Sequence, residues 1–220
     1  MQKAKRILGL FLTACLVFAL SACGEGGAPA EENTNGLQAP SAAETNPPAG
    51  SRTAEQSRPS PANTGALVAY FSATGNTEAV AEKLAEITGA ALYEILPADP
   101  YTSEDLDYGN EQSRTSLEMD DPDARPQIGS EPIAIEQYST LYLGYPIWHG
   151  QAPRIMSTFV ESYDFDGITV IPFCTSGGSG IGASGEQLAT LAGSGTWLSG
   201  ERFSGSASAS DLQAWLDTIH

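Results

Sequence analysis

The sequence predicts an α/β fold in which helices cover both faces of a parallel sheet. Residues 66–71 form a short apolar and aromatic run, typical of a strand that is buried on both sides. Apolar residues then recur at helical spacing over residues 78–88. This alternation of strand and helix continues to the end of the chain. We therefore expect a three-layer, doubly wound, five-stranded parallel sheet.

The predicted elements follow one another as strand and helix, with one interruption. Gly89 ends the first helix, because glycine readily adopts the left-handed conformation of helix C-termini. Ser210 is predicted to cap the last helix. Residues 97–138 are long, acidic and irregular, and loops of this length are usually functional or mobile. The predicted strands are residues 66–71, 90–96, 141–145, 168–173 and a short stretch within 196–203; the predicted helices are residues 78–88, 110–119, 153–162, 184–191 and those after Ser210.

The N-terminus has the features of a targeting segment. Lys3, Lys5 and Arg6 precede a mostly apolar run at residues 7–20, which is too short for a confident membrane span. Small residues follow, so residues 1–22 are predicted to be a secretory signal peptide. Cys23 comes directly after Leu-Ser-Ala, which resembles a bacterial lipobox and implies that Cys23 is lipidated. The alternatives are a plain signal peptide with an incidental cysteine and, less favoured, an uncleaved anchor helix.

Residues 23–64 are predicted to be a disordered tether. The stretch from 24 to 63 holds six prolines and no aromatic residue, and its other residues are mostly small or polar. Such a composition cannot build a core. The folded domain is therefore assigned to residues 65–220. The predicted location is extracytoplasmic, with the protein attached to the cell membrane by its lipid.

Charge and cysteine usage narrow the function classes. The formal net charge is −17, which disfavours nucleic acid as a partner and favours basic protein surfaces. Cys15 leaves with the signal peptide and Cys23 carries lipid, so only Cys174 remains in the mature chain. An intramolecular disulfide is thus excluded. Cys174 follows an apolar strand and is interpreted as a small buried hydrophobic residue, not as a nucleophile.

A turn between the first strand and the first helix has the chemistry of a phosphate site. It consists of Ser72, Ala73, Thr74, Gly75, Asn76 and Thr77. The first amides of a helix have no partner within the helix and bind phosphate well. The side chains add hydroxyl and amide donors, while the glycine lets the backbone approach closely. The turn lacks the lysine of a P-loop. The alternative is an ordinary helix cap by serine or threonine.

This turn resembles the phosphate loop of flavodoxins, whose pattern is Ser/Thr-x-Thr-Gly-x-Thr after the first strand. Residues 72–77 match every fixed position of the pattern. The resemblance implies non-covalently bound flavin mononucleotide (FMN) and the sheet order 2-1-3-4-5. In that order the ligand sits beyond the carboxyl ends of the strands, at the switch between strands 1 and 3. It also implies electron transfer between redox partner proteins or membrane electron carriers.

The loop after the third strand matches the family's second flavin loop in position and type. Its residues are Pro146, Ile147, Trp148, His149 and Gly150. A tryptophan there can lie flat against the flavin ring, and glycine lets a nearby peptide turn over. The alternative for Trp148 is a core position at the edge of the loop. His149 is equally compatible with a flavin contact and with a solvent-facing position.

The loop after the fourth strand matches the family by position alone. Its candidate residues are Thr175, Ser176, Gly177, Gly178, Ser179 and Gly180. The resemblance implies that their backbone amides reach the pyrimidine part of the flavin. Well-known flavodoxins often carry an aromatic residue here, and this chain does not. Either the second flavin face is open to a substrate, or Tyr108 of the long acidic segment covers it.

Three functions remain open from the sequence. The first is an FMN-binding electron-transfer protein, whose acidic charge should lower the flavin potential. The second is an FMN-dependent NAD(P)H:quinone-type oxidoreductase, which the glycine-rich loop favours and the lack of an arginine cluster opposes. The third is a binding module without flavin. The sequence shows no catalytic acid or nucleophile, and its two histidines, His149 and His220, are too few for a metal site.

Overall fold

The computed structural model describes residues 65–219 of the chain. The predicted signal peptide, Cys23 and the predicted tether lie outside the described residues, as does His220. No helix within 65–219 combines the length and the apolar character that a bilayer crossing needs.

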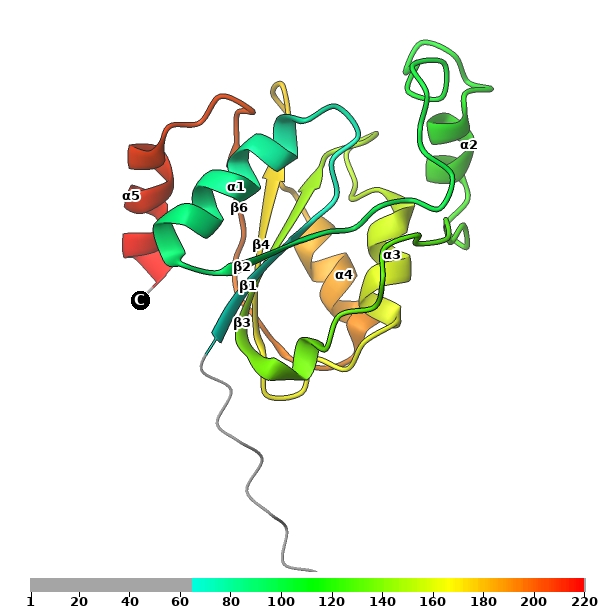
Figure 1. Cartoon of the computed structure of the whole chain (residues 1–220). Helices are drawn as coiled ribbons and strands as arrows, with labels where there is room; N and C mark the ends of the chain where they lie inside the picture. The colour runs from blue at the N-terminus through cyan, green and yellow to red at the C-terminus, as the bar shows by residue number, and fades with distance from the viewer. Residues whose placement is uncertain (1–64, 220) are drawn as a thin grey trace, which may run out of the picture. The chain divides into compact units, whose positions relative to one another are not determined.

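One parallel sheet forms the centre of the domain (Figure 1). Its strands run in the order β2-β1-β3-β4-β5, and β6 also pairs with β4. The predicted order 2-1-3-4-5 is thereby confirmed. All pairings are parallel, so the carboxyl ends of the strands meet at one edge. The strands are β1 (Gly65–Tyr70), β2 (Ala91–Glu94), β3 (Tyr138–Pro146), β4 (Thr169–Thr175), β5 (Thr196–Trp197) and β6 (Glu201–Phe203).

Helices cover both faces of the sheet and complete three layers (Figure 1). On one face α1 (Asn76–Thr88) and α5 (Ala209–Ile219) bury Val80, Leu84 and Leu212 against the strands. On the other face α3 (Arg154–Glu161) and α4 (Ser184–Ala192) bury Phe159 and Leu188. The strands supply both cores because successive side chains point to opposite faces.

The fifth position of the sheet holds two short strands where the sequence predicted one. β5 lies beside the start of β4 and β6 beside its end, and residues 198–200 separate them. Pro172 of β4 faces this gap and has no N–H for the ladder. Gly200 fits tightly there, since a Cβ on it would lie 2.5 Å from the Pro172 carbonyl oxygen.

The start of the last helix also differs from the prediction. Ser210 lies inside α5, which begins at Ala209. Ser208 and Asp211 bond reciprocally: the Ser208 amide donates to Asp211 Oδ2 at 2.9 Å, and the Asp211 amide donates to Ser208 Oγ at 3.2 Å. This exchange resembles a capping box, which two residues at the right spacing stabilise better than one serine alone.

The predicted irregular segment lies between β2 and β3. It contains α2 (Arg114–Asp120), which is four residues shorter at its start than the predicted helix, and a 3-10 turn, η1 (Ile135–Gln137). Ser113 caps α2 by accepting a hydrogen bond from the amide of Ser116 at 3.3 Å. We call residues 97–137 the inserted segment. Figure 1 shows α2 set apart from the sheet, on the side of α3.

Candidate functional site: a cavity at the carboxyl ends of the strands

A cavity of about 490 Å³ lies at the edge where the sheet strands end. Its size falls within the range of small-molecule sites, which is roughly 300–1,000 Å³. Five stretches of chain form it: the loops after β1, β3 and β4, the inserted segment, and the end of β6 with the residues after it. The lining residues are Ala73, Thr74, Asn76, Thr77, Leu106, Tyr108, Pro146, Ile147, Trp148, Thr175, Ser176, Gly177, Arg202, Ser204 and Gly205.

The structure thus brings together most of the residues that the sequence singled out. Members of all three predicted loops line one cavity, although 98 residues separate Thr77 from Thr175. The predicted residues that do not line it are Ser72, Gly75, His149, Gly150, Gly178, Ser179 and Gly180.

The N-terminus of α1 is free to bind a ligand. Gly75 precedes the helix with a φ of 79°, a left-handed conformation that suits glycine, and no side chain caps the helix. The Thr74 hydroxyl instead accepts a hydrogen bond from Asn76 Nδ2 at 2.9 Å. The ordinary serine or threonine cap, which was the alternative from sequence, is therefore not present. The first amides of α1 remain available to an anion.

Ser72 supplies an independent sign that the turn is built for a ligand. Its Oγ atom is shielded from solvent and has no hydrogen-bond partner; within residues 65–219 no other shielded side-chain nitrogen or oxygen lacks one. Leaving a buried hydroxyl unpaired costs about 1–3 kcal/mol. A phosphate oxygen bound at the turn would accept this hydrogen bond. The residues present therefore fit a phosphate group.

Trp148 forms one wall of the cavity and belongs to the core at the same time. The residue is only 2% exposed. The edges of its neighbours hold it: the ring centroid of Phe71 lies 5.4 Å away at 84°, and that of Tyr101 lies 5.1 Å away at 81°. These contacts fix the orientation of the indole before any ligand binds. Stacking of Trp148 on a flavin stays a prediction.

A tight turn follows Trp148. The amide of Trp148 donates to the Gln151 carbonyl at 2.9 Å, and the Gln151 amide returns a bond of the same length. His149 and Gly150 at the tip both have positive φ, 47° and 80°. His149 is the one non-glycine residue with positive φ in the described chain. Its ring contacts Tyr108 at a centroid distance of 5.4 Å, so the turn meets the inserted segment.

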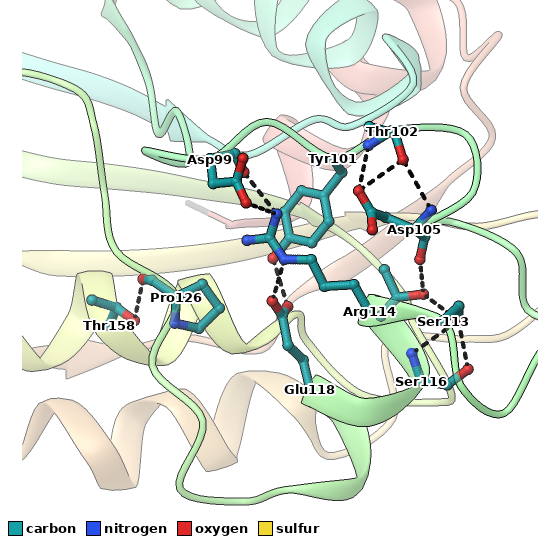
Figure 2. Close-up of polar contacts among 11 residues, drawn as sticks. Asp99, Tyr101, Thr102, Asp105, Ser113, Arg114, Ser116, Glu118, Pro126 and Thr158 are labelled. Atoms are coloured by element: carbon teal, nitrogen blue, oxygen red, sulfur yellow. Dashed lines mark hydrogen bonds and ion pairs between the residues drawn. The ribbon is translucent and has the colours of Figure 1, made fainter. Parts of the chain in front are cut away.

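A charged cluster within the inserted segment surrounds Tyr101 (Figure 2). The Arg114 guanidinium lies 4.1 Å above the Tyr101 ring, whose edge meets Trp148. Glu118 accepts hydrogen bonds from Tyr101 Oη at 2.6 Å and from Arg114 Nε at 2.7 Å. Arg114 Nη1 also donates to the Asp99 carbonyl at 2.8 Å. Burial, together with the Glu118 carboxylate, raises the pKa of Tyr101 above its usual value.

Helix α3 holds the other side of the inserted segment. Arg154 donates to the carbonyls of Met119 at 2.7 Å and Asp121 at 3.0 Å, where α2 ends. Thr158 donates to the Pro126 carbonyl at 2.9 Å (Figure 2). A guanidinium suits the end of a helix because the last carbonyls are unpaired and carry partial negative charge. These contacts fix the segment whose Leu106 and Tyr108 line the cavity.

Tyr108 lies where the sequence offered it as a cover for the cavity. It lines the cavity and is 53% exposed. Partial burial raises the pKa of Tyr108 above its usual value. The loop after β4 contributes no aromatic ring, and a Cβ on Gly177 or Gly178 would meet no atom within 4 Å.

The sequence missed four lining residues: Leu106, Arg202, Ser204 and Gly205. Arg202 lies in β6, and Ser204 and Gly205 come directly after it. The parallel pairing of β6 with β4 brings the end of β6 to the edge of the sheet where the cavity lies. Gly205 lets the chain approach α1, because a Cβ there would lie 2.4 Å from Asn76 Oδ1. The one local signal was a small-residue stretch directly after a short predicted strand.

Cys174 lies in the core, as the sequence predicted. Cys174 is fully buried, and burial raises the pKa of its thiol to about 12. A neutral, inaccessible thiol is not a nucleophile, so the interpretation as a buried hydrophobic residue is confirmed. In the described part of the chain, no group of three His, Cys, Asp or Glu residues is placed to hold a metal ion.

Comparison with known proteins places the chain in a family. Residues 65–219 match the model of a family described as Flavodoxin. Two Bacteroides crystal structures described as a "putative flavoprotein" are similar: that of B. eggerthii is 48% identical and that of B. uniformis 44%, both with a TM-score of 0.67. They cover 71% and 70% of this chain, and 98% and 97% of their own.

A more distant structure shares the fold. The Lactobacillus acidophilus flavoprotein, solved in complex with FMN, is 21% identical with a TM-score of 0.54, over 69% of this chain and 98% of that one. No curated protein is significantly similar to the chain. The family match spans the whole described domain, from β1 through α5, and includes all three predicted loops. The chain belongs to the flavodoxin family.

Proposed function

We propose that the domain binds FMN non-covalently in this cavity and serves as an electron-transfer protein. The observation that carries the proposal is the uncapped N-terminus of α1 together with the unpartnered Ser72 hydroxyl, in a turn whose Thr74, Asn76 and Thr77 line the cavity. The L. acidophilus flavoprotein, solved in complex with FMN, shows that this fold accommodates the cofactor.

The protein's own residues bind and orient the cofactor. The α1 amides, Ser72, Thr74 and Thr77 would hold the phosphate. Ile147, Trp148 and Gly177 would surround the ring together with Tyr108, and the last three lining positions, Arg202, Ser204 and Gly205, close the cavity. FMN, when bound, would supply reversible electron uptake, and the residues of the cavity wall would set the energetics of that uptake.

The test compares FMN with riboflavin, which lacks the phosphate. The purified domain should bind FMN and turn yellow, and riboflavin should bind at least tenfold more weakly, because bonds to a charged group are worth about 1.5–3 kcal/mol. Fluorescence titration measures both affinities. Equal affinities would contradict the phosphate placement. A colourless protein that takes up no FMN would leave a flavin-free binding module as the function.

A second candidate is an FMN-dependent NAD(P)H:quinone-type oxidoreductase. The open space at Gly177 and Gly178 favours it, because a substrate could enter there. Against it, Arg202 is the one cationic group in the cavity wall, whereas a nicotinamide dinucleotide is a polyanion. Anaerobic mixing with NADH or NADPH separates the two: a carrier should stay oxidised, while direct bleaching of the flavin would establish the reductase.

We also propose that Cys23 anchors the protein outside the cytoplasmic membrane, where its partners are redox proteins or membrane electron carriers. The support is the charged and apolar leader that ends in Leu-Ser-Ala-Cys. Cys23→Ala should release the protein from the membrane fraction or block its maturation. A cleaved Cys23→Ala protein that stays membrane-bound would rule out this anchor.

A further inference from the structure

We propose that Arg202 raises the reduction potential of the flavin by placing a positive charge in the cavity wall. This inference rests on the proposed function. The inference adds to that function a residue that tunes the flavin potential. It also predicts that this residue raises the potential, whereas the negative net charge of the chain suggests a lowered one.

Arg202 stands out because of the charge balance of the wall. The chain has a formal charge of −17, but no acidic residue lines the cavity and Arg202 is its one charged residue. Among residues 65–219 the ion pairs join Arg114 to Asp99 and Glu118, and Arg125 to Glu161, so no carboxylate neutralises Arg202 at close range.

The guanidinium points toward the loop after β4. Arg202 Nε donates to Ser176 Oγ at 3.1 Å, and Nη2 donates to the Ser176 carbonyl. The Ser176 hydroxyl in turn donates to the Ser179 carbonyl. The nearest acid along the chain, Glu201, is exposed and accepts from the backbone amide of Arg202 at 2.8 Å. Arg202 therefore fixes the loop, and its guanidinium forms no ion pair within the described residues.

The loop that Arg202 fixes has free donors. Within the described residues, the amides of Gly177 and Gly178 take part in no hydrogen bond to backbone or side chain. Both glycines face open space. Arg202 is hydrogen-bonded to Ser176, the residue directly before Gly177, and both Gly177 and Arg202 line the cavity, so a ring bound beside Gly177 lies close to the guanidinium.

The electrostatic consequence follows from the charge that reduction adds. Uptake of two electrons and one proton changes the flavin ring from neutral to an anion with one negative charge. A nearby cation stabilises that anion and leaves the neutral oxidised ring almost unaffected. The surface carboxylates destabilise the reduced, anionic flavin only weakly, because salt screens exposed charges beyond about 8 Å.

The expected change in midpoint potential can be estimated from the effect of nearby charges on pKa values. An opposite charge within roughly 4–6 Å shifts such equilibria by about 1–3 units. Arg202→Gln should therefore weaken binding of reduced FMN about tenfold more than binding of oxidised FMN. For a two-electron couple, a tenfold change lowers the midpoint potential by about 30 mV.

The experiment measures oxidised-state affinity by fluorescence and midpoint potential by anaerobic dithionite titration against a reference dye. Arg202→Lys keeps the charge and should retain most of the wild-type potential. Lys83→Gln is the matched control: it removes one positive charge from α1 outside the cavity wall, where Lys83 Nζ donates to the Ala207 carbonyl at 3.0 Å. The control should leave the potential unchanged.

Three outcomes would overturn the inference: an unchanged potential in Arg202→Gln, an equal shift in Lys83→Gln, or equal weakening of both redox states. The last would leave Arg202 with loop positioning alone. Wild-type protein that binds no FMN would overturn the proposed function as well, so the two failures are distinguishable.

The wild-type protein provides a second measurement that needs no variant. If Arg202 keeps the reduced ring anionic, one proton accompanies two electrons, and the potential should change by about 30 mV per pH unit between pH 6 and pH 8. In Arg202→Gln the potential should follow the steeper slope, which corresponds to uptake of two protons, up to a higher pH than in the wild type. A two-proton slope in the wild type across this range would also overturn the proposal.

Discussion

Thr77 at the start of α1 and Thr175 at the end of β4 share a buried hydrogen bond of 2.8 Å between their hydroxyls. Both residues also line the cavity. The bond joins the phosphate turn to the loop after β4, so the two ends of the site are held at a fixed distance before a ligand binds.

Thr77→Val should destabilise the ligand-free domain by about 1–3 kcal/mol, because it leaves the buried Thr175 hydroxyl unpaired. The double variant Thr77→Val/Thr175→Val should be close to neutral, since two apolar groups of the same shape replace the pair. Urea unfolding measures both. A Thr77→Val protein as stable as the wild type would show that the bond contributes nothing.

Ser72→Ala should separate binding from stability. The Ser72 hydroxyl has no partner in the domain, so its removal should not destabilise the ligand-free protein. FMN affinity should fall roughly ten- to a hundredfold, because a bond to a charged phosphate is lost. Riboflavin affinity, the control, should not change. A loss of stability with unchanged FMN affinity would contradict this role.

Arg114→Met should loosen the inserted segment. The variant keeps the apolar stem over Tyr101 but removes the cation and leaves Glu118, whose side chain is 15% exposed, without its ion pair. A cation over a tyrosine and a partly buried ion pair together are worth about 1–2 kcal/mol. Amide hydrogen exchange at residues 99–120 should therefore accelerate roughly tenfold.

Arg125→Met is the matched control for this change. It breaks the more exposed ion pair with Glu161, whose side chain is 37% exposed, and such pairs contribute at most about 1 kcal/mol. Exchange at residues 99–120 should stay at the wild-type rate. Equal acceleration in the two variants would mean that the Arg114 cluster has no special role.

His149→Gly should be more stable than His149→Ala by up to about 1 kcal/mol. Both variants lose the ring contact with Tyr108, so their difference isolates the backbone. His149 has a φ of 47°, and the left-handed conformation costs a non-glycine residue roughly 1–2 kcal/mol, which the flexibility of glycine in the unfolded chain partly offsets. Thermal unfolding of the two proteins gives the comparison. An alanine variant as stable as the glycine variant would show that the turn stores no strain.

Local sequence patterns were enough to predict the elements that form from consecutive residues. The apolar run at residues 66–71, the turn from Ser72 to Thr77 and the helical spacing that follows together predicted β1, the phosphate turn and α1. The order of the strands followed from the family resemblance, and the structure confirmed it. Each of these signals lies within about a dozen consecutive residues.

Only the tertiary structure decided which distant residues complete the cavity. Arg202 reaches it because β6 pairs in parallel with β4, a register that no periodicity encodes, and because Pro172 splits the fifth position of the sheet. Tyr108 reaches it because Arg154 of α3 anchors the inserted segment, and because Tyr101, held by Arg114, packs against Trp148. Strand register and the docking of a long loop arise from contacts between residues far apart in the chain. Such contacts form only when the whole domain packs.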